Sequence, residues 1–202
     1  MFTGIVQHCC PIVRIEREKN FMRYIVRLSD ALIEGVKAGA SISVSGVCQT
    51  VVSIDDNDVA FDAMEETLKC TNLGELREND LVNIERSARI GDEIGGHMLS
   101  GHVVGIAKIA EIQKNDDNVK VFFECSPEWM AMIFPKGFIA IDGASLTIVD
   151  AQKEGMFSVY LIPETLKRTT FGMKNVGDAV NIELDAMTQA VVRTVERVMQ
   201  SR

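Results

Sequence analysis

The chain has 202 residues, of which 47% are hydrophobic and 25% are charged, a balance typical of globular proteins. Its net charge of −8 argues against a surface that binds nucleic acid or an anionic membrane. No apolar run is long enough to span a bilayer, and no signal-peptide pattern opens the chain, so we expect a cytoplasmic protein without nucleic-acid or membrane partners.

The cysteines and histidines predict neither disulfides nor a metal site. The cysteine count is odd and no C-x-x-C pair occurs, so we expect free thiols at Cys9, Cys10, Cys48, Cys70 and Cys125. His8 lies beside two cysteines, but alternate residues of a strand face opposite ways, and the other histidines lack the spacing of a helical zinc pair. No glycine-rich phosphate loop occurs either, so we expect no cofactor and no metal.

Short segments rich in β-branched residues run through the first half of the chain and predict strands. These strands are expected at residues 23–28, 41–47, 50–54, 59–63 and 81–85. Charged turns separate them, one of them at 16–20, and the sequence ETLK with the threonine and glycine that follow predicts a short helical connection before the last strand. About six short strands in a segment of this length predict a small closed barrel or a sandwich.

The second half of the chain repeats the first at an offset of 97 and then 98 residues. SGVCQTVV (45–52) falls on DGASLTIV (142–149), and EETLKCTNLG (65–74) falls on PETLKRTTFG (163–172). The matching strands are expected at 119–124, 138–144, 146–151 and 157–162. This period is the size of a domain, so the chain is a duplicated domain with a boundary near the Gly-rich and charged stretch GDEIGGH (91–97).

The end of the chain has no counterpart in the first half. After Asp185, which is suited to cap a helix, apolar residues recur at helical spacing at Met187, Val191, Val195, Val198 and Met199. A lone helix of this length is marginal in water and must dock on something. We expect it either to pack on its own barrel or to pair with copies of itself.

Small polar residues occupy equivalent positions in the two halves. The pairs are Thr3 and Ser100, Cys48 and Ser145, Thr50 and Thr147, and Glu66 and Glu164. Residues two apart on a strand share a face, so each half presents a pair of small polar side chains on one face. Any one of these residues could be an ordinary barrel residue, but the repeated set indicates a functional site in each half.

These motifs resemble the riboflavin synthase family of the alpha-chain type, whose domains bind lumazines. The resemblance rests on MFTGIV, G-x-C-x-T repeated as G-x-S-x-T, GGHMLSGHV and the doubled ETL-x-x-T-x-x-G, and it covers all 202 residues. It implies an all-β fold of two tandem six-stranded Greek-key β-barrels, at residues 1–97 and 98–185. It also implies a C-terminal α-helix at 186–202 that gathers a homotrimer.

The same resemblance implies an activity. Members of this family are transferases that convert two molecules of 6,7-dimethyl-8-ribityllumazine into riboflavin and 5-amino-6-ribitylaminouracil, the last step of riboflavin biosynthesis. A four-carbon unit moves from one lumazine to the other without a cofactor or metal, so two related pockets would serve two copies of one substrate. A contact with lumazine synthase is a further partner that the resemblance suggests.

The resemblance also assigns residues to the two pockets. It places in the N-terminal pocket Gly4, Ile5, Val6, Cys48, Gln49, Thr50, Asp62, Ala63, Met64, Glu65, Glu66 and Thr67. It places in the C-terminal pocket Gly101, His102, Val103, Lys136, Ser145, Leu146, Thr147, Tyr160, Leu161, Ile162, Pro163 and Glu164. The residues expected to be catalytic are His102, Cys48, Ser145 and Thr147.

The residue types fit the implied chemistry. The lumazine 7-methyl group is an acidic carbon acid, so the protein must position two rings, stabilise an anion and move protons. His102 has the side chain whose usual pKa lies nearest neutrality, and Cys48 is expected to be a small polar contact rather than a nucleophile. Gln49 departs from the leucine typical of the family, which Leu146 keeps in the second half; by alternation Gln49 faces away from Cys48, and in a barrel core its amide would need partners.

Two alternatives belong to other functional classes. Antenna proteins of luminous bacteria share the duplication and hold a lumazine or flavin without turning it over. The presence of His102, Ser145 and Thr147 in intact motifs favours the enzyme over such a binding protein. A flavin-binding barrel of a reductase is the weaker alternative, because this chain has no room for the nucleotide-binding domain that it would need.

Overall fold

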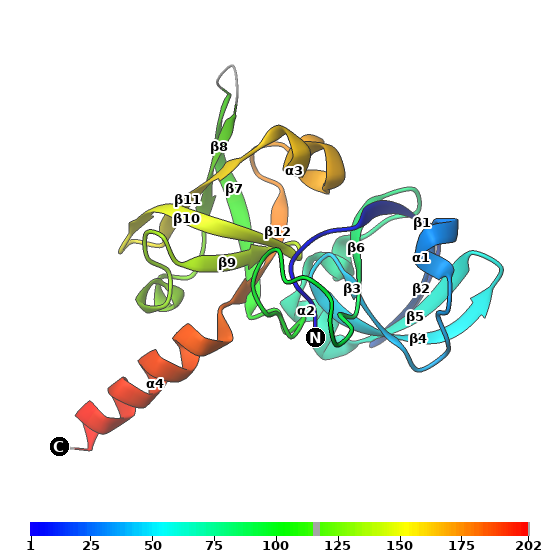
Figure 1. The fold of residues 1–202 in the computed structure, drawn as a ribbon, viewed down its shortest axis with the longest axis horizontal. Coiled ribbons are helices and arrows are strands. Elements are labelled where there is room, and N and C mark those ends of the chain that lie inside the picture. Colours follow the sequence, from blue (N-terminus) through cyan, green and yellow to red (C-terminus); the bar gives the residue numbers. More distant parts are fainter. Residues whose placement is uncertain (115–117, 202) are drawn as a thin grey trace.

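Two closed antiparallel β-barrels lie side by side, and a single long helix stands outside both (Figure 1). The computed structural model describes residues 1–114 and 118–201, so the last residue of the predicted tail, 202, lies outside the described residues. Each barrel has six strands within this described part, which confirms the predicted fold class.

The first barrel is built from residues 8–86. Its elements are β1 (His8–Glu18), β2 (Phe21–Arg27), α1 (Asp30–Ile33), β3 (Ser41–Val44), β4 (Val47–Asp55), β5 (Asp58–Met64), α2 (Glu65–Cys70), the 3-10 turn η1 (Asn72–Glu75) and β6 (Leu81–Arg86). The order β1-β2-β5-β4-β3-β6 contains a Greek key. Buried and exposed residues alternate along β2, so Tyr24 and Val26 fill the interior while Arg27 faces solvent.

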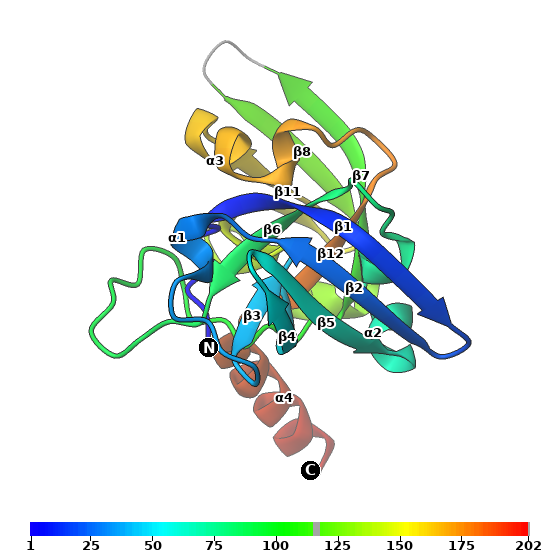
Figure 2. The ribbon, with the colours of Figure 1, turned by 90° about the vertical axis from the view of Figure 1, so that its right-hand side faces the viewer.

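The second barrel repeats this plan. Its elements are β7 (Gly105–Lys114), β8 (Val119–Glu124), η2 (Pro127–Ala131), β9 (Phe138–Ile141), β10 (Ala144–Gln152), β11 (Met156–Leu161), α3 (Pro163–Arg168), η3 (Thr170–Gly172) and β12 (Ala179–Leu184). The strands close in the same cyclic order as those of the first barrel. Figure 2, turned by a quarter, shows β1 and β2 lengthwise on the first barrel and the β7–β8 hairpin rising from the second.

The strand predictions were right in place but wrong in several bounds. Residues 41–47 were expected to form one strand, yet Ser45 and Gly46 have φ values of 46° and 83° and turn the chain between β3 and β4. Residues 138–144 are divided in the same way between β9 and β10, because a two-residue hairpin with two positive φ values matches the twist of the strands it joins. β1 also continues to Glu18, through residues that were expected to turn. The ETLK stretches are the short helices α2 and α3, as predicted.

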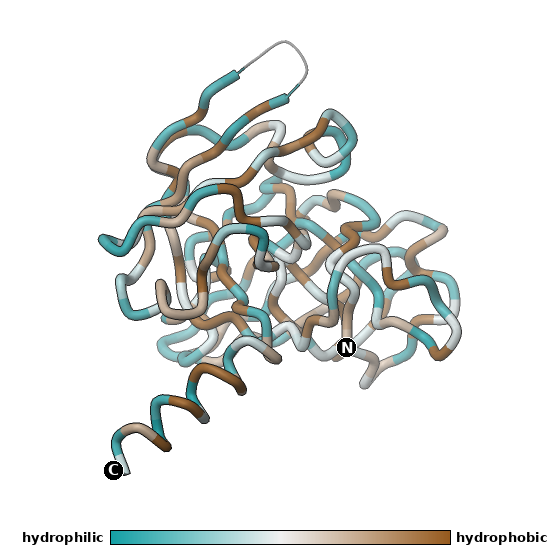
Figure 3. The backbone as a smooth tube through the Cα atoms, turned by 60° about the vertical axis from the view of Figure 1, so that its left-hand side comes forward, coloured by the Kyte–Doolittle hydropathy of each residue, from teal (hydrophilic) through white to brown (hydrophobic). Residues whose placement is uncertain are grey.

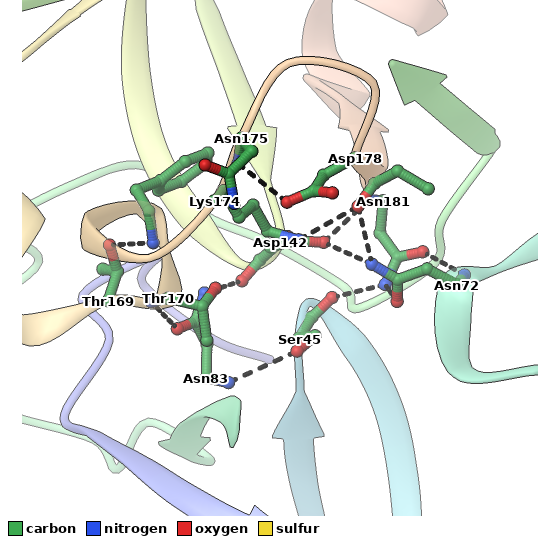
Figure 4. A network of polar contacts seen from close by, with 12 residues as sticks. Ser45, Asn72, Asn83, Asp142, Thr169, Thr170, Lys174, Asn175, Asp178 and Asn181 are labelled. Atoms are coloured by element: carbon green, nitrogen blue, oxygen red, sulfur yellow. Dashed lines mark hydrogen bonds and ion pairs between the residues drawn. The ribbon is translucent and has the colours of Figure 1, made fainter. Parts of the chain in front are cut away.

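A network of polar contacts joins the two barrels (Figure 4). The Asn83 side-chain amide donates to the Asp142 carbonyl oxygen at 2.8 Å, and its counterpart Asn181 donates to the Ser45 carbonyl oxygen at the same distance. The Asp142 carboxylate lies 3.1 Å from the Lys174 ammonium, and burial raises the pKa of that carboxyl group. The paired contacts show that the two barrels meet around an approximate two-fold axis.

The C-terminal helix α4 (Ala186–Gln200) extends away from the barrels (Figure 1). The Asp185 carboxylate caps it by accepting a hydrogen bond from the Thr188 N–H at 2.7 Å. None of its residues is buried, and hydrophobic positions recur along its length (Figure 3). The alternative that this helix packs on its own barrel is therefore wrong for the single chain.

The five cysteines are free thiols, as expected. Burial raises the pKa of the Cys10 and Cys125 thiols to about 11, so both behave as core residues. Within the described part of the chain, no helix has both the length and the apolar character that a membrane crossing requires.

Candidate functional site

The first candidate site lies at the start of β4. Cys48 is half-buried and Thr50 is exposed on the outer face of the strand, while Gln49 between them points into the barrel. The Gln49 oxygen accepts a hydrogen bond from the Tyr24 hydroxyl at 3.1 Å, and its NH₂ donates to the Cys48 carbonyl oxygen at 3.1 Å. Both the oxygen and the NH₂ group of the buried Gln49 amide therefore have a hydrogen-bond partner, as a polar group in a core requires.

The start of β10 repeats this arrangement. Ser145 is half-buried and Thr147 is exposed, while Leu146 faces the second core. The alternation predicted from the sequence is confirmed for both strands. Each barrel thus presents one small polar pair outward at the same place.

A second strand and a short helix adjoin each pair. Val51 pairs with Phe61, which brings the residues around Thr50 next to the end of β5 and the start of α2. Ile148 pairs with Val159 in the same way, which brings Thr147 next to the end of β11. The ends of β5 and β11 therefore run beside the polar pairs, and α2 and α3 follow these strands directly along the chain. Met64 and its counterpart Ile162 expose 62% and 59% of their surfaces there.

Several of these neighbours are held by ion pairs. The Asp62 carboxylate accepts two hydrogen bonds from the Arg23 guanidinium, at 2.7 and 2.8 Å. Glu164 pairs with Arg168 one helical turn away, and this contact lowers the pKa of the Glu164 carboxyl group. The Asp62 pair ties β5 to β2, and the Glu164 pair lies within the helix α3.

Two extended segments complete the sites, and they cross between the barrels. We call residues 2–6 arm 1 and residues 99–103 arm 2. The Cys48 N–H of the first barrel donates to the Gly101 carbonyl oxygen of arm 2 at 2.9 Å, and the Ser145 N–H of the second barrel donates to the Gly4 carbonyl oxygen of arm 1 at 2.8 Å. Val6 of arm 1 is buried in the second core, and Val103 of arm 2 packs against the first.

This crossing corrects the predicted grouping of residues. Gly4, Ile5 and Val6 were expected beside Cys48, and Gly101, His102 and Val103 beside Ser145. The structure exchanges the two triplets. Sequence order suggested the wrong grouping because each arm stands at the start of its own repeat. Only the tertiary contacts show that arm 1 lies against the second barrel and arm 2 against the first.

Glycine is required where each arm crosses. Gly101 has a φ of 80°, and a Cβ built on it would lie 2.5 Å from the Cys48 Cβ. Gly4 has a φ of 75°, and its Cβ would lie 2.5 Å from the Ser145 Cβ. Both the left-handed backbone and the close approach exclude a side chain at these positions.

His97 is a candidate that the sequence reasoning missed, because it falls in the stretch taken as a linker. Its Nδ1 lies 2.7 Å from the Ser145 Oγ, and its ring stacks on Phe138 with centroids 5.0 Å apart. Burial lowers the pKa of its imidazole, and its Nε2 is buried without a protein partner in the described structure.

His102 and Lys136 lie in more open surroundings. His102 is exposed beyond Gly101, and its N–H donates to the Ser100 Oγ at 3.2 Å. Lys136 has a φ of 69°, and its N–H donates to the Ile148 carbonyl oxygen as that of Gly39 does to Val51, both at 2.8 Å. Positions 39 and 136 are therefore structurally equivalent in the two barrels.

The duplicated barrels and their paired sites agree with what is known of other proteins. The family model for the lumazine binding domain matches residues 3–87 and 100–185. The riboflavin synthase of Escherichia coli (strain K12) is 48% identical over 203 residues, which covers 100% of this chain and 95% of that protein. The riboflavin synthase of Chlamydia pneumoniae is 44% identical, with 100% and 98% covered.

Solved structures give the same answer for the fold. LumP in complex with riboflavin has a TM-score of 0.85 and 26% identity, and covers 92% of this chain and 100% of its own. LumP in complex with 6,7-dimethyl-8-(1'-D-ribityl) lumazine has a TM-score of 0.83, also at 26% identity, with 92% and 99% covered. The chain belongs to the lumazine-binding domain family. The relatives of full length described above are enzymes of the riboflavin synthase type.

Proposed function

We propose that this protein catalyses the conversion of two molecules of 6,7-dimethyl-8-ribityllumazine into riboflavin and 5-amino-6-ribitylaminouracil. The single observation that carries the proposal is the pair of equivalent sites in one chain, at Cys48 and at Ser145. A reaction between two copies of one molecule needs two similar binding places. The full-length likeness to riboflavin synthases supports the same reaction.

The site residues suggest how the flat rings are bound. Exposed apolar side chains at Met64, Ile162 and Ile5 can cover ring faces, because they gain from burial against a ligand. The small polar groups at Cys48, Thr50, Ser145 and Thr147 can meet the ring edges. Each site would then consist of a β-strand start, the strand and helix beside it, and one crossing arm.

The chemistry needs the 7-methyl group of one lumazine to lose a proton. Hydrogen-bond donors fixed around the ring would stabilise the resulting anion, and holding two rings together would remove the entropy cost of their encounter. We assign proton transfer to His102, which is exposed beside the N-terminal site. Burial lowers the pKa of His97, which favours its neutral form, and its Nδ1 is placed to orient the Ser145 hydroxyl in the other site.

The uncovered helix α4 supports the proposed homotrimer. Val191 and Val195 expose 59% and 53% of their surfaces in the single chain, and an apolar stripe of this kind is stabilised when copies of the helix pack together. In this proposal the N-terminal site of one subunit faces the C-terminal site of its neighbour. A cytoplasmic location and a contact with lumazine synthase remain predictions.

Incubation of the purified protein with 6,7-dimethyl-8-ribityllumazine tests the proposal. Riboflavin and the uracil should form in equal amounts, one of each for every two lumazines consumed, and the absorbance of riboflavin reports the rate. Tight binding of the lumazine without any riboflavin would contradict the proposal and identify a non-catalytic binding protein.

A further inference from the structure

Each crossing arm is held by one buried carboxylate at the end of a barrel. Glu85, on the last strand β6 of the first barrel, is 4% exposed. Its Oε1 accepts hydrogen bonds from the Thr3 N–H at 2.6 Å and the Thr3 hydroxyl at 2.8 Å, and its Oε2 accepts one from the Gly4 N–H at 3.0 Å. All three donors belong to arm 1.

The second barrel repeats the arrangement with nearly the same distances. Glu183, on the last strand β12, is also 4% exposed. It accepts hydrogen bonds from the Ser100 N–H at 2.7 Å, the Ser100 hydroxyl at 2.8 Å and the Gly101 N–H at 3.0 Å. These donors belong to arm 2.

The two carboxylates act across the barrel interface. Glu183 belongs to the second barrel, yet the arm that it holds lies against Cys48 of the first. Glu85 belongs to the first barrel, yet its arm lies against Ser145 of the second. The neighbouring contact between the arms is symmetric as well, because Phe2 and Leu99 exchange N–H to carbonyl hydrogen bonds at 2.8 and 2.9 Å.

We propose that Glu85 and Glu183 are positioning residues that act crosswise, each fixing the arm that completes the ligand site of the other barrel. The proposal rests on the proposed function for the identity of the ligand, and on the hydrogen bonds above for the crossing. A carboxylate suits this task because it only accepts, and three donors converge on each one.

The variants Glu183→Gln and Glu85→Gln remove this match while keeping the size of the side chain. A glutamine has one acceptor oxygen, and its NH₂ would face the N–H or hydroxyl that the lost oxygen served. A buried donor left without a partner is costly, so the arm should leave its place for a fraction of the time. Each barrel keeps its own closed sheet, and each arm reaches a core only through Val6 or Val103, so the effect should stay close to the arm.

The thiol of Cys48 reports on arm 2 in the full-length protein. Brief labelling with iodoacetamide, followed by mass spectrometry of peptides, gives a rate for each cysteine. We expect Glu183→Gln to raise the labelling of Cys48 about tenfold, and Glu85→Gln to leave it unchanged. In chains that also carry Ser145→Cys, Glu85→Gln should raise labelling at position 145, and Glu183→Gln should not.

Riboflavin then serves as the ligand probe. It should protect Cys48 from labelling in the unmodified chain and in Glu85→Gln, and the riboflavin concentration needed for protection should rise about tenfold in Glu183→Gln. A merely structural role would instead raise the labelling of the core thiols Cys10 and Cys125 together with Cys48.

Three results would overturn the crosswise action: Cys48 responding to Glu85→Gln instead, Cys48 responding equally to both variants, or all thiols rising together. Failure of riboflavin to protect Cys48 in the unmodified chain would overturn the proposed ligand site. The effect of Glu183→Gln on labelling without ligand would still stand in that case, so the two failures are distinguishable.

Discussion

Replacing Val191 and Val195 by aspartate tests whether the helix α4 holds copies of this chain together. The two valines lie one turn apart on the apolar stripe and are more than half exposed in the single chain. If the stripe forms a three-helix contact, each substitution places a carboxylate in that contact. The double variant should therefore fall apart into monomers.

The size of the effect follows from the number of buried groups. Burying one valine side chain stabilises an assembly by about 1.5–3 kcal/mol, so two valines in each of three chains contribute on the order of 10 kcal/mol. Each unpaired carboxylate in the contact would add a cost of a few kcal/mol. An association free energy of about 12 kcal/mol corresponds to nanomolar affinity. Losing the contribution of the valines removes most of such an association free energy, so the double variant should be monomeric at micromolar concentrations.

Sedimentation velocity is the assay, with the lumazine reaction followed in parallel. Arg193→Asp is the matched control, because it changes the net charge by the same amount as the two valine substitutions together. Arg193 lies on the side of the helix opposite to the two valines. We expect the control to sediment as the unmodified protein and the double variant to sediment as a monomer with much reduced activity. An unchanged trimer in the double variant would refute the reasoning.

Four further predictions concern the sites themselves. His102→Gln should lower the turnover rate about 10²–10⁴-fold while the affinity for riboflavin stays nearly unchanged; a loss of affinity without a loss of turnover at saturation would make His102 a binding residue. Gly101→Ala should abolish binding at the N-terminal site. Gly35→Ala, with φ of 67° and no atom near its Cβ, should cost only about 1–2 kcal/mol in urea unfolding, and an equal loss of binding in the two variants would contradict the close approach at Gly101. Burial lowers the pKa of His97 below 6.5, so the free energy of unfolding should fall as the pH drops below that value; His97→Gln should remove this part of the fall, and identical pH profiles would count against it. The isolated segment 1–97 should pair with a second copy of itself and bind riboflavin, because arm 1 of one copy can take the place of arm 2 against Cys48 of the other copy; no fluorescence change at high micromolar protein would argue against this.

The sequence by itself determined the repeat and most of the strand faces, and it left a closed barrel or a sandwich as the two possible folds until the family resemblance implied barrels. The match of the Cys48 and Ser145 segments needs only local comparison, and alternation along a strand decides which neighbours share a face. The helical stripe of α4 is likewise a local pattern, and so is its cap at Asp185. Local rules suffice here because strand pleat and helix period act within a few residues of each position.

Only the tertiary structure decided which parts of the chain form one site. Gly4 reaches Ser145 across most of the sequence, and the contact is made by backbone groups that every residue carries, so no side-chain pattern marks it. His97 looked like linker because glycine and charge surround it, yet the fold brings it against Ser145. The crossing of the arms depends on how two finished barrels meet, and that is a property of their packed surfaces, not of any one segment.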